Sequence, residues 1–228
     1  MRATAVVARS VLLVWTLAAF IVAGIGAPGT AGAQPATQRA ATTPRAASGA
    51  QVILFKGLAG IFSSGMIDLG EKLTRHGIAN RVESQADSVA VTEEIVARYR
   101  GGARGPIILV GHSLGADAAG GTARRLNDQG IPVALLVTFS PWQDAQVTPN
   151  VAQAINYYQT MSGWRGRLVA APGFHGSLSN IDLDGASGVN HFNIEKDDRL
   201  HQETIAKISA ALGRTHAKTQ APSPTGRN

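Results

Sequence analysis

The sequence predicts an α/β fold in which helices cover both faces of a doubly wound, mostly parallel sheet of about five to six strands. Three observations support this prediction. Short segments that are apolar throughout alternate with segments whose apolar residues recur at helical spacing, which is typical of strands buried on both faces. Glycine and polar residues separate these segments. The 228 residues are 44% hydrophobic and 16% charged, which suits one globular domain with a substantial core.

The first expected strand is the apolar run 51–55, which glycines end. A helix should follow from Ser63 or Ser64, because a serine hydroxyl can cap the first free N–H groups, and it should end at Gly77. Residues 78–82 are the second expected strand.

The second expected helix begins at Asp87 or Ser88 and ends at a pair of glycines. Residues 106–110 form a third apolar strand, and the alanine-rich segment 116–126 is the next helix. Residues 131–139 are almost wholly apolar and predict the fourth strand.

Residues 154–159 are a candidate fifth strand, and 199–212 form the expected closing helix. In sheets of this kind ligands bind beyond the carboxyl ends of the strands. We therefore expect the functional side chains in four regions: 56–62, 111–115, 140–150 and around residue 190.

The composition excludes several function classes. The chain has no cysteine, which removes disulfide scaffolds, zinc–thiolate sites and thiol catalysis. The net charge is +6, but the positive residues are scattered, so we expect no nucleic-acid partner. The sequence contains no phosphate-binding loop, dinucleotide fingerprint or metal-ligand spacing, so we expect neither a cofactor nor a metal.

Residues 1–33 are typical of a secretory signal peptide. Arg2 and Arg9 come first, the uncharged apolar stretch 11–27 follows, and residues 31–33 form an Ala-x-Ala pattern. We therefore expect an exported protein, either periplasmic or secreted. The apolar stretch approaches the length that spans a bilayer, so membrane association through an uncleaved N-terminus is the alternative.

Two further segments lack an apolar period. Residues 34–50 predict a flexible spacer, and residues 214–228 predict a disordered tail. The folded domain is therefore expected over residues 51–213.

A candidate nucleophile directly follows the expected strand 106–110. Residues 111–115 read Gly-His-Ser-Leu-Gly and precede a helix. In such a Gly-x-Ser-x-Gly turn the serine, here Ser113, adopts a strained conformation that exposes its hydroxyl, and the glycines permit close backbone approach. The N–H of Leu114 and the positive end of the helix dipole would then face a developing oxyanion.

Extended by one residue to 111–116, the motif Gly-His-Ser-Leu-Gly-Ala resembles the nucleophile elbow of the α/β-hydrolase superfamily, as found in lipases, esterases and thioesterases. The resemblance covers about 51–213 and implies a minimal member without the first two strands or a large cap domain. It implies a serine hydrolase that cleaves a small carboxylic ester or thioester through an acyl-enzyme on Ser113, with no cofactor.

The resemblance also implies a second oxyanion donor in the loop after the first strand. Gly57 matches the glycine of the family's His-Gly pair, and Lys56 stands where histidine is usual. The N–H of Leu58 is then the expected partner of the Leu114 N–H, with Ala59 as the alternative.

The base of the resembling family lies in a loop before the closing helix, and His191 matches that place. His175, in a glycine-rich loop, is the alternative. His201 is expected on the surface of the last helix and His216 in the tail, while His112 is expected to support the elbow.

The acid of the expected triad has no matching residue. Some lipases carry Asp-Pro after the strand that follows the elbow helix, whereas this chain has Ser140-Pro141 there. Asp144, four residues further on, is the first candidate, and Asp182, close in sequence to His191, is the second. A dyad with a weaker group in place of the acid is also open.

Gly57, His112 and Trp142 are expected to line the substrate site. The missing Asp-Pro pair also motivates a second hypothesis, in which the chain is a catalytically degenerate binding or envelope-associated protein. The two hypotheses differ in whether Ser113 is nucleophilic.

Overall fold

The computed structural model describes residues 49–58, 64–160, 166–186 and 188–213. Three expected segments lie outside the described residues, namely the signal peptide 1–33, nearly all of the spacer 34–50 and the tail 214–228. The structure therefore does not test what the sequence predicts for them.

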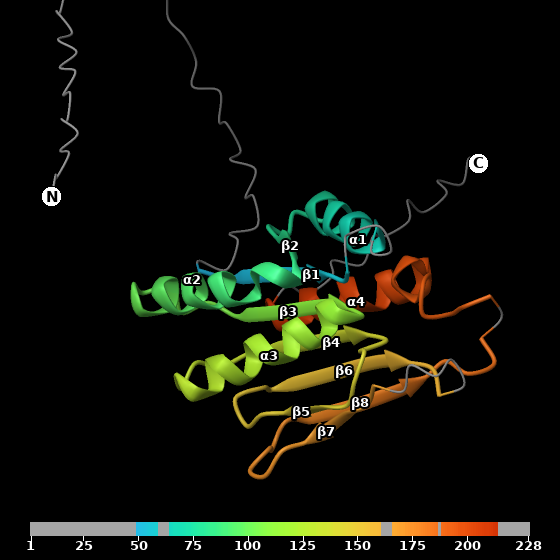
Figure 1. Ribbon diagram of the computed structural model, residues 1–228. Helices are drawn as coiled ribbons and strands as arrows, with labels where there is room; N and C mark the ends of the chain where they lie inside the picture. Colours follow the sequence, from blue (N-terminus) through green and yellow to red (C-terminus); the bar gives the residue numbers. More distant parts are fainter. Residues whose placement is uncertain (1–48, 59–63, 161–165, 187, 214–228) are drawn as a thin grey trace, which may run out of the picture. The chain divides into compact units, whose positions relative to one another are not determined.

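One parallel sheet has the strand order β2-β1-β3-β4-β6-β8 (Figure 1). From the first strand the chain adds one neighbour on one side and four on the other, so the sheet is doubly wound. The described strands therefore confirm the predicted fold class. The strand bounds are β1 (Gln51–Lys56), β2 (Arg81–Ser84), β3 (Ile107–His112), β4 (Leu135–Phe139), β6 (Gln153–Tyr158) and β8 (Ser177–Asp182).

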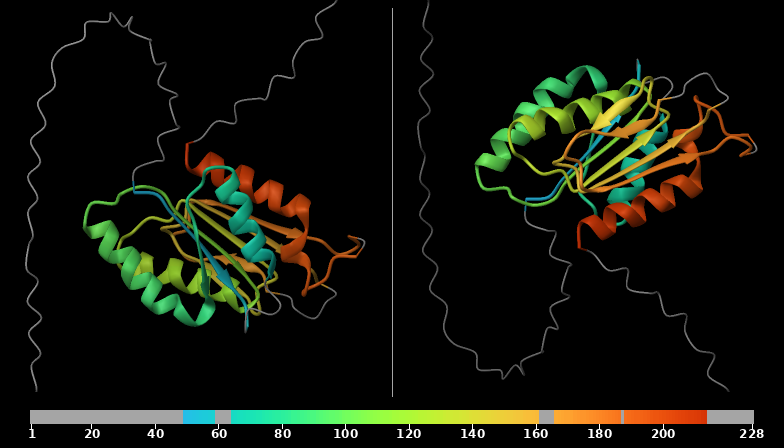
Figure 2. Two further views of the ribbon diagram at one scale, coloured as in Figure 1. Left: turned by 90° about the horizontal axis from the view of Figure 1, so that it is seen from above. Right: turned by 90° about the horizontal axis from the view of Figure 1, so that it is seen from below.

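Helices cover both faces of this sheet, with α1 and α4 on one face and α2 and α3 on the other (Figure 2). The helix bounds are α1 (Ser64–Arg75), α2 (Ser88–Arg100), α3 (Leu114–Asp128) and α4 (Asp198–Ala211), with short 3₁₀ turns at η1 (Gln85–Asp87) and η2 (Ile194–Lys196).

The strands are apolar throughout because each contributes to two cores. Successive side chains of a strand point to opposite faces. Leu54 and Ile108 therefore pack with α1 and α4, while Ile53 and Leu109 pack with α2 and α3. The chain thus needs both helical layers before its central strands are fully buried.

Two expected strands have different bounds in the structure. The expected strand 78–82 corresponds to β2, which begins only at Arg81, because Ile78 is a buried residue of the preceding turn. The expected strand 131–139 corresponds to β4, which begins at Leu135. The first part of the expected strand is instead a connection that packs against the core. Its buried residues are apolar, so its composition resembles that of a strand.

Three strands were not expected from the sequence. β8 is mostly exposed, because it lies at the sheet edge and has no continuous apolar run. β5 (Ala145–Val147) and β7 (Leu168–Ala170) form a separate two-stranded parallel sheet. Strands of three residues carry too short a pattern to be recognised.

Candidate active site

Ser113 lies between β3 and α3 in a conformation that few residues other than glycine adopt. Its φ is 56° and its ψ is −127°. Its backbone N–H donates to the carbonyl of Phe139 at the end of β4, at 3.0 Å, which ties the turn to the sheet. Backbone strain of this kind is typical of functional turns and agrees with the predicted elbow.

The two glycines of the elbow have no room for a side chain. A Cβ at Gly111 would lie 2.1 Å from the carbonyl oxygen of Gly115. A Cβ at Gly115 would lie 2.2 Å from the carbonyl oxygen of Phe55 in β1. The predicted close backbone approaches are therefore present, one to the elbow helix and one to the neighbouring strand.

His191 reaches Ser113 from the loop before η2. Its Nε2 lies 3.1 Å from Ser113 Oγ, and its side chain is 4% exposed. Burial lowers the pKa of His191 below its ordinary value, so the ring is neutral near neutral pH. A neutral imidazole at this distance can accept the hydroxyl proton.

Ser140 occupies the other side of the His191 ring. Its Oγ lies 2.7 Å from Nδ1. The residue follows β4 directly, is 1% exposed and has a φ of 45°. Its N–H donates to the carbonyl of Tyr157 at 2.7 Å, which fixes the turn that places the hydroxyl. The structure thus assembles Ser113, His191 and Ser140 in one line of hydrogen bonds.

The expectation that Asp144 or Asp182 holds His191 is not supported by their positions. Asp144 is exposed, and its carboxylate accepts from the backbone N–H of Arg167 at 2.6 Å. Asp182, at the exposed end of β8, accepts from the hydroxyl of Thr160 at 2.5 Å and from the N–H of Asp184 at 2.9 Å. Both carboxylates are used to shape loops, and the place beside Nδ1 belongs to a serine.

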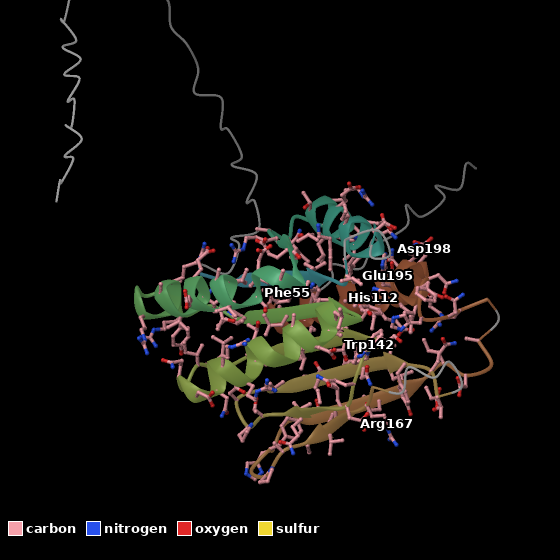
Figure 3. All side chains as sticks on the ribbon, viewed as in Figure 1. Phe55, His112, Trp142, Arg167, Glu195 and Asp198 are labelled. Atoms are coloured by element: carbon pink, nitrogen blue, oxygen red, sulfur yellow. The ribbon has the colours of Figure 1, made fainter. Side chains whose placement is uncertain are left out.

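His112 supports the base through its backbone. Its Nε2 lies 2.8 Å from the carbonyl oxygen of His191 and 4.0 Å from the carboxylate of Glu195. Figure 3 shows His112 and Glu195 next to each other where β3 meets the start of α4. Burial lowers the pKa of His112 to about 4, so the ring is neutral and its Nε2–H can donate to the carbonyl.

Asp117 joins the elbow helix to the loop that carries Ser140. It lies in the first turn of α3, and the backbone N–H groups of Trp142 and Gln143 face its carboxylate. Burial is the larger influence and raises the pKa of Asp117 to about 6. The residue therefore links two parts of the site rather than orienting His191.

The expected oxyanion donors lie on the site side of the sheet. Leu114 is the first residue of α3, so its N–H has no acceptor within the helix. Gly57 and Leu58 follow β1, whose carboxyl end lies beside β3. The alternative donor Ala59 lies outside the described residues.

Three large apolar side chains next to these residues are exposed to solvent. Leu58 is 61% exposed, Trp142 49% and Phe192 51%. Each neighbours or nearly neighbours a site residue in the sequence, namely Gly57, Ser140 and His191 respectively. Phe192 meets the His191 ring edge-on, with 5.2 Å between the ring centres.

The other histidines lie elsewhere. His175 is exposed in the turn before β8, at the amino end of that strand, away from the carboxyl ends that carry Ser113. The expectation that His201 is a surface residue is wrong, since it is fully buried. Its Nδ1 lies 2.8 Å from the ammonium group of Lys72. His216 lies outside the described residues.

The residue types around His201 are those of metal ligands, because Asp68 and Asp198 lie beside it. The ammonium group of Lys72, however, is 2.7 Å from Asp68 and 2.5 Å from Asp198. A lysine therefore already supplies the positive charge for this cluster.

No family model and no curated protein matches the chain. Solved structures with similar architecture include YbtT, a type II thioesterase of the yersiniabactin pathway, at 12% identity over 74% of this chain and 96% of that one, with a TM-score of 0.47. A cutinase-like protein from Cryptococcus sp. has 16% identity over 75% and 98%, with a TM-score of 0.47. A putative α/β-superfamily hydrolase from Xanthomonas campestris has 14% identity over 68% and 98%, with a TM-score of 0.37.

These similarities are too distant to assign an activity. The α/β-hydrolase resemblance is carried by this chain's own features, which are the doubly wound sheet and the strand–turn–helix context of Ser113. Both were predicted from the sequence and both are present.

Sequence reasoning missed the roles of two residues. The sequence identifies Ser140 only as the residue that stands in place of an aspartate, and its position directly after a strand and before a proline is the signal that points to it. Glu195 was not singled out, because a lone glutamate in a charged segment is ordinarily exposed. Only the three-dimensional arrangement shows that it is buried beneath the site.

Proposed function

We propose that this protein is a serine hydrolase that cleaves a carboxylic ester or thioester through an acyl-enzyme on Ser113. The observation that carries this proposal is the continuous contact from Ser113 Oγ to His191 Nε2 at 3.1 Å and from His191 Nδ1 to Ser140 Oγ at 2.7 Å. It is the arrangement that a nucleophile, its base and the group that orients the base require.

Acylation begins when the Ser113 hydroxyl proton passes to Nε2 of His191 and Oγ bonds to the acyl carbon. The N–H groups of Leu58 and Leu114 stabilise the tetrahedral oxyanion, aided by the amino end of α3. The carbon–oxygen or carbon–sulfur bond then breaks, and the leaving alkoxide or thiolate takes the proton from Nε2.

Deacylation repeats these steps with water. Water gives a proton to Nε2 of His191 while its oxygen attacks the acyl carbon of the ester on Ser113. When the tetrahedral intermediate collapses, the bond to Ser113 Oγ breaks, Nε2 returns its proton to Oγ, and the carboxylic acid leaves.

Ser140 makes this base weaker than one held by a carboxylate. A carboxylate only accepts hydrogen bonds and therefore forces the proton onto Nδ1, whereas a hydroxyl can also donate. Ser140 consequently permits the unproductive tautomer of His191 and adds no negative charge to stabilise its imidazolium form. Esters and thioesters, whose leaving groups need less acid assistance than amines, are the substrates that suit such a base.

The exposed apolar residues Leu58, Trp142 and Phe192 favour an apolar acyl group. We call these three side chains the apolar rim. An acyl chain that covers them removes apolar surface from water, which favours its binding.

We further propose that the protein is exported, on the basis of the leader-like residues 1–33. None of the helices in the described part of the chain combines the length and the hydropathy of a membrane span. Mass spectrometry of the protein isolated from its native cell tests the proposal, because cleavage after Ala33 shortens the chain, whereas an anchored protein keeps its N-terminus.

The second candidate function is a binding protein that has lost catalysis. Ser140 in the position of an aspartate is the observation that favours it. Such a protein would retain the apolar rim and bind an acyl compound without turning it over.

A panel of p-nitrophenyl esters and acyl thioesters of increasing chain length tests the proposal. We expect turnover by the full chain and a mass increase of one acyl group on Ser113 after rapid quenching. Ser113→Ala should lose both while keeping its circular dichroism spectrum. A folded wild-type protein that binds these compounds without hydrolysis would support the binding protein instead.

A further inference from the structure

Glu195 is a buried acid for which the mechanism above has no use. It lies in η2, four residues after His191, and its side chain is fully buried. The backbone N–H groups of Glu195 itself and of Gly65 face its carboxyl group. Within the described residues, however, neither carboxyl oxygen makes a hydrogen bond of normal geometry.

Three elements of the fold meet at this residue. Its carboxylate lies 4.0 Å from Nε2 of His112, the neighbour of Ser113. Its backbone carbonyl packs so closely on Gly65, in the first turn of α1, that a Cβ there would lie 2.0 Å away. The same carbonyl accepts from Nε2 of His201 in α4 at 2.6 Å. Glu195 is therefore fixed from β3, α1 and α4 at once.

The charges around Glu195 are unevenly distributed. On its own element Lys196 favours the ionised carboxylate. From α1, the amino end of the helix faces it, and that helix has no acidic residue in its first turn. The ions near His201, namely Lys72, Asp68 and Asp198, pair with one another. From β3 the group that faces the carboxylate is the neutral His112.

The backbone N–H groups that face this side chain would be served equally by the oxygen of a neutral amide, so they do not explain why an acid stands here. Burial raises the pKa of Glu195 to about 7, so the ionised form is disfavoured in the folded protein. A buried carboxylate without normal hydrogen bonds destabilises a fold, and a neutral isostere would be more stable. Ionisable groups that reduce stability are retained mainly where activity needs them.

His112 connects this acid to the catalytic histidine. Since a carbonyl oxygen only accepts, the 2.8 Å contact between His112 Nε2 and the His191 carbonyl requires the proton on Nε2. A negative carboxylate 4.0 Å from the same nitrogen favours that proton position. The contact then holds the backbone of His191, and with it the ring beside Ser113.

We propose that Glu195 is a positioning residue that acts through His112, and that its negative charge compensates for the neutral Ser140 when His191 becomes an imidazolium. This inference rests on the proposed hydrolase function. It assigns the anion of the site to a residue that lies beneath the histidines, and not to the place beside Nδ1.

The proposal predicts the pH dependence of kcat. Protonation of His191 removes the base, and the pKa of that ring is lowered, so activity rises with pH below the ordinary histidine range. Ionisation of Glu195 should add a second rise near pH 7. Replacing Glu195 with glutamine should remove the second rise and move the first to lower pH, because a protonated His191 draws Glu195 toward its ionised form and the glutamine supplies no such charge.

The test compares Glu195→Gln with Glu203→Gln in the full chain. Glu203 is a partly exposed acid of α4 that binds the hydroxyl of Tyr157, so it controls for the loss of one carboxylate near the same helix. We expect Glu195→Gln to lower kcat about tenfold above pH 7 with KM unchanged. We also expect its melting temperature at that pH to rise, while Glu203→Gln changes neither kcat nor the pH profile.

His112→Gln shows whether the effect passes through His112. In that background Glu195→Gln should cause no additional loss, because the connecting ring is gone. Glu195→Gln that keeps the wild-type kcat and both rises would overturn the proposal. So would a variant that is less stable at every pH, since that is the mark of a structural residue.

A readout without turnover separates this proposal from the proposed function. In protein labelled with ¹⁵N-histidine, the ring nitrogen shifts of His191 report its tautomer and its pKa. We expect Glu195→Gln to lower the pKa of His191, whether or not the wild-type protein hydrolyses any ester. A pKa of His191 that Glu195→Gln leaves unchanged would overturn the role of Glu195. If Glu195→Gln lowers the pKa of His191 as expected, but the wild-type protein is never acylated, only the hydrolase function is overturned.

Discussion

The two sides of the site are built in different ways. The nucleophile side, residues 111–115, is one continuous segment in which close backbone contacts exclude a side chain at Gly111 and at Gly115. The base side brings together His191 and Ser140, which lie 51 residues apart, and its hydrogen bonds join side chains from separate loops. The first side is determined by steric contacts between neighbouring residues, and the second by the tertiary packing that brings distant loops together.

This difference predicts how each side responds to substitution. A change at the elbow should affect folding first, because backbone atoms would collide. A change at Ser140 should affect catalysis first, because the hydroxyl makes one contact in a site whose backbone is already fixed.

The largest effect is expected for Gly115→Ala. Its Cβ would lie 2.2 Å from the Phe55 carbonyl oxygen, so β1 or α3 must move. We expect a loss of more than about 3 kcal/mol in the free energy of unfolding, measured by urea denaturation. Gly120→Ala in the same helix is the matched control.

A Cβ at Gly120 would lie 4.0 Å from the Ala145 side chain, which is an ordinary contact. Alanine is the better helix former, so this control should gain about 1 kcal/mol. Equal destabilisation by both substitutions would show that the elbow glycines are not required by sterics.

The next largest effect is expected at Ser140. Ser140→Ala removes the partner of Nδ1 and should lower kcat about tenfold to a hundredfold with little change in KM. Ser140→Asp supplies a group that only accepts hydrogen bonds, so its kcat should exceed that of Ser140→Ala. The negative charge raises the pKa of His191, so the acid limb of the pH profile should move to higher pH. Steady-state ester hydrolysis measures both, and wild-type activity in Ser140→Ala would show that this side chain does not orient the base.

Asp117 tests the junction between the two sides. Its pKa is raised to about 6 in the folded protein, so the folded state binds the proton more tightly than the unfolded state, and stability falls as pH rises from about 4 to about 6. Asp117→Asn lacks this loss and should gain about 1 to 2 kcal/mol over the wild type above that range.

The histidines with lowered pKa values act in the opposite direction, because the unfolded state protonates them first as pH falls. The difference between Asp117→Asn and the wild type isolates the single carboxyl group. Denaturation curves at several pH values measure it, and a difference that does not change with pH would contradict the raised pKa.

The smallest effect is expected at the apolar rim. Trp142→Ala and Phe192→Ala should raise KM severalfold for long-chain esters, by about 1 kcal/mol of lost apolar contact, and leave kcat for acetyl esters unchanged. A matched change on a distant exposed residue, Val169→Ala, should alter neither value. Equal losses for acetyl and long-chain esters would place these side chains in the reaction rather than in acyl binding.

The sequence was informative for those features that depend on residues close together in the chain. The fold class, the helix positions and the elbow followed from apolar runs, caps and the glycine spacing. The sequence marks the place of Ser140, directly after an expected strand and before a proline, but it does not show that this hydroxyl reaches Nδ1 of His191. The chemistry of a triad favours a carboxylate, and the two nearest candidates in the sequence, Asp144 and Asp182, bind other groups in the structure.

The burial of charged and polar side chains was equally inaccessible to sequence reasoning. His201 and Glu195 occur in a segment whose composition is that of a solvated helix start. Both are nevertheless fully buried, because α1 packs against η2 and α4 there. The edge strand β8 was missed for the converse reason, since its exposure leaves no apolar run.

The most direct test of the account is covalent labelling with a fluorophosphonate probe, followed by mass spectrometry of the peptide that contains Ser113. The account predicts rapid labelling of the wild type at Ser113, none in Ser113→Ala, and strongly slowed labelling in His191→Ala. A folded wild-type protein that does not label, or labelling at Ser113 that His191→Ala leaves unchanged, would contradict the claim that His191 activates this serine.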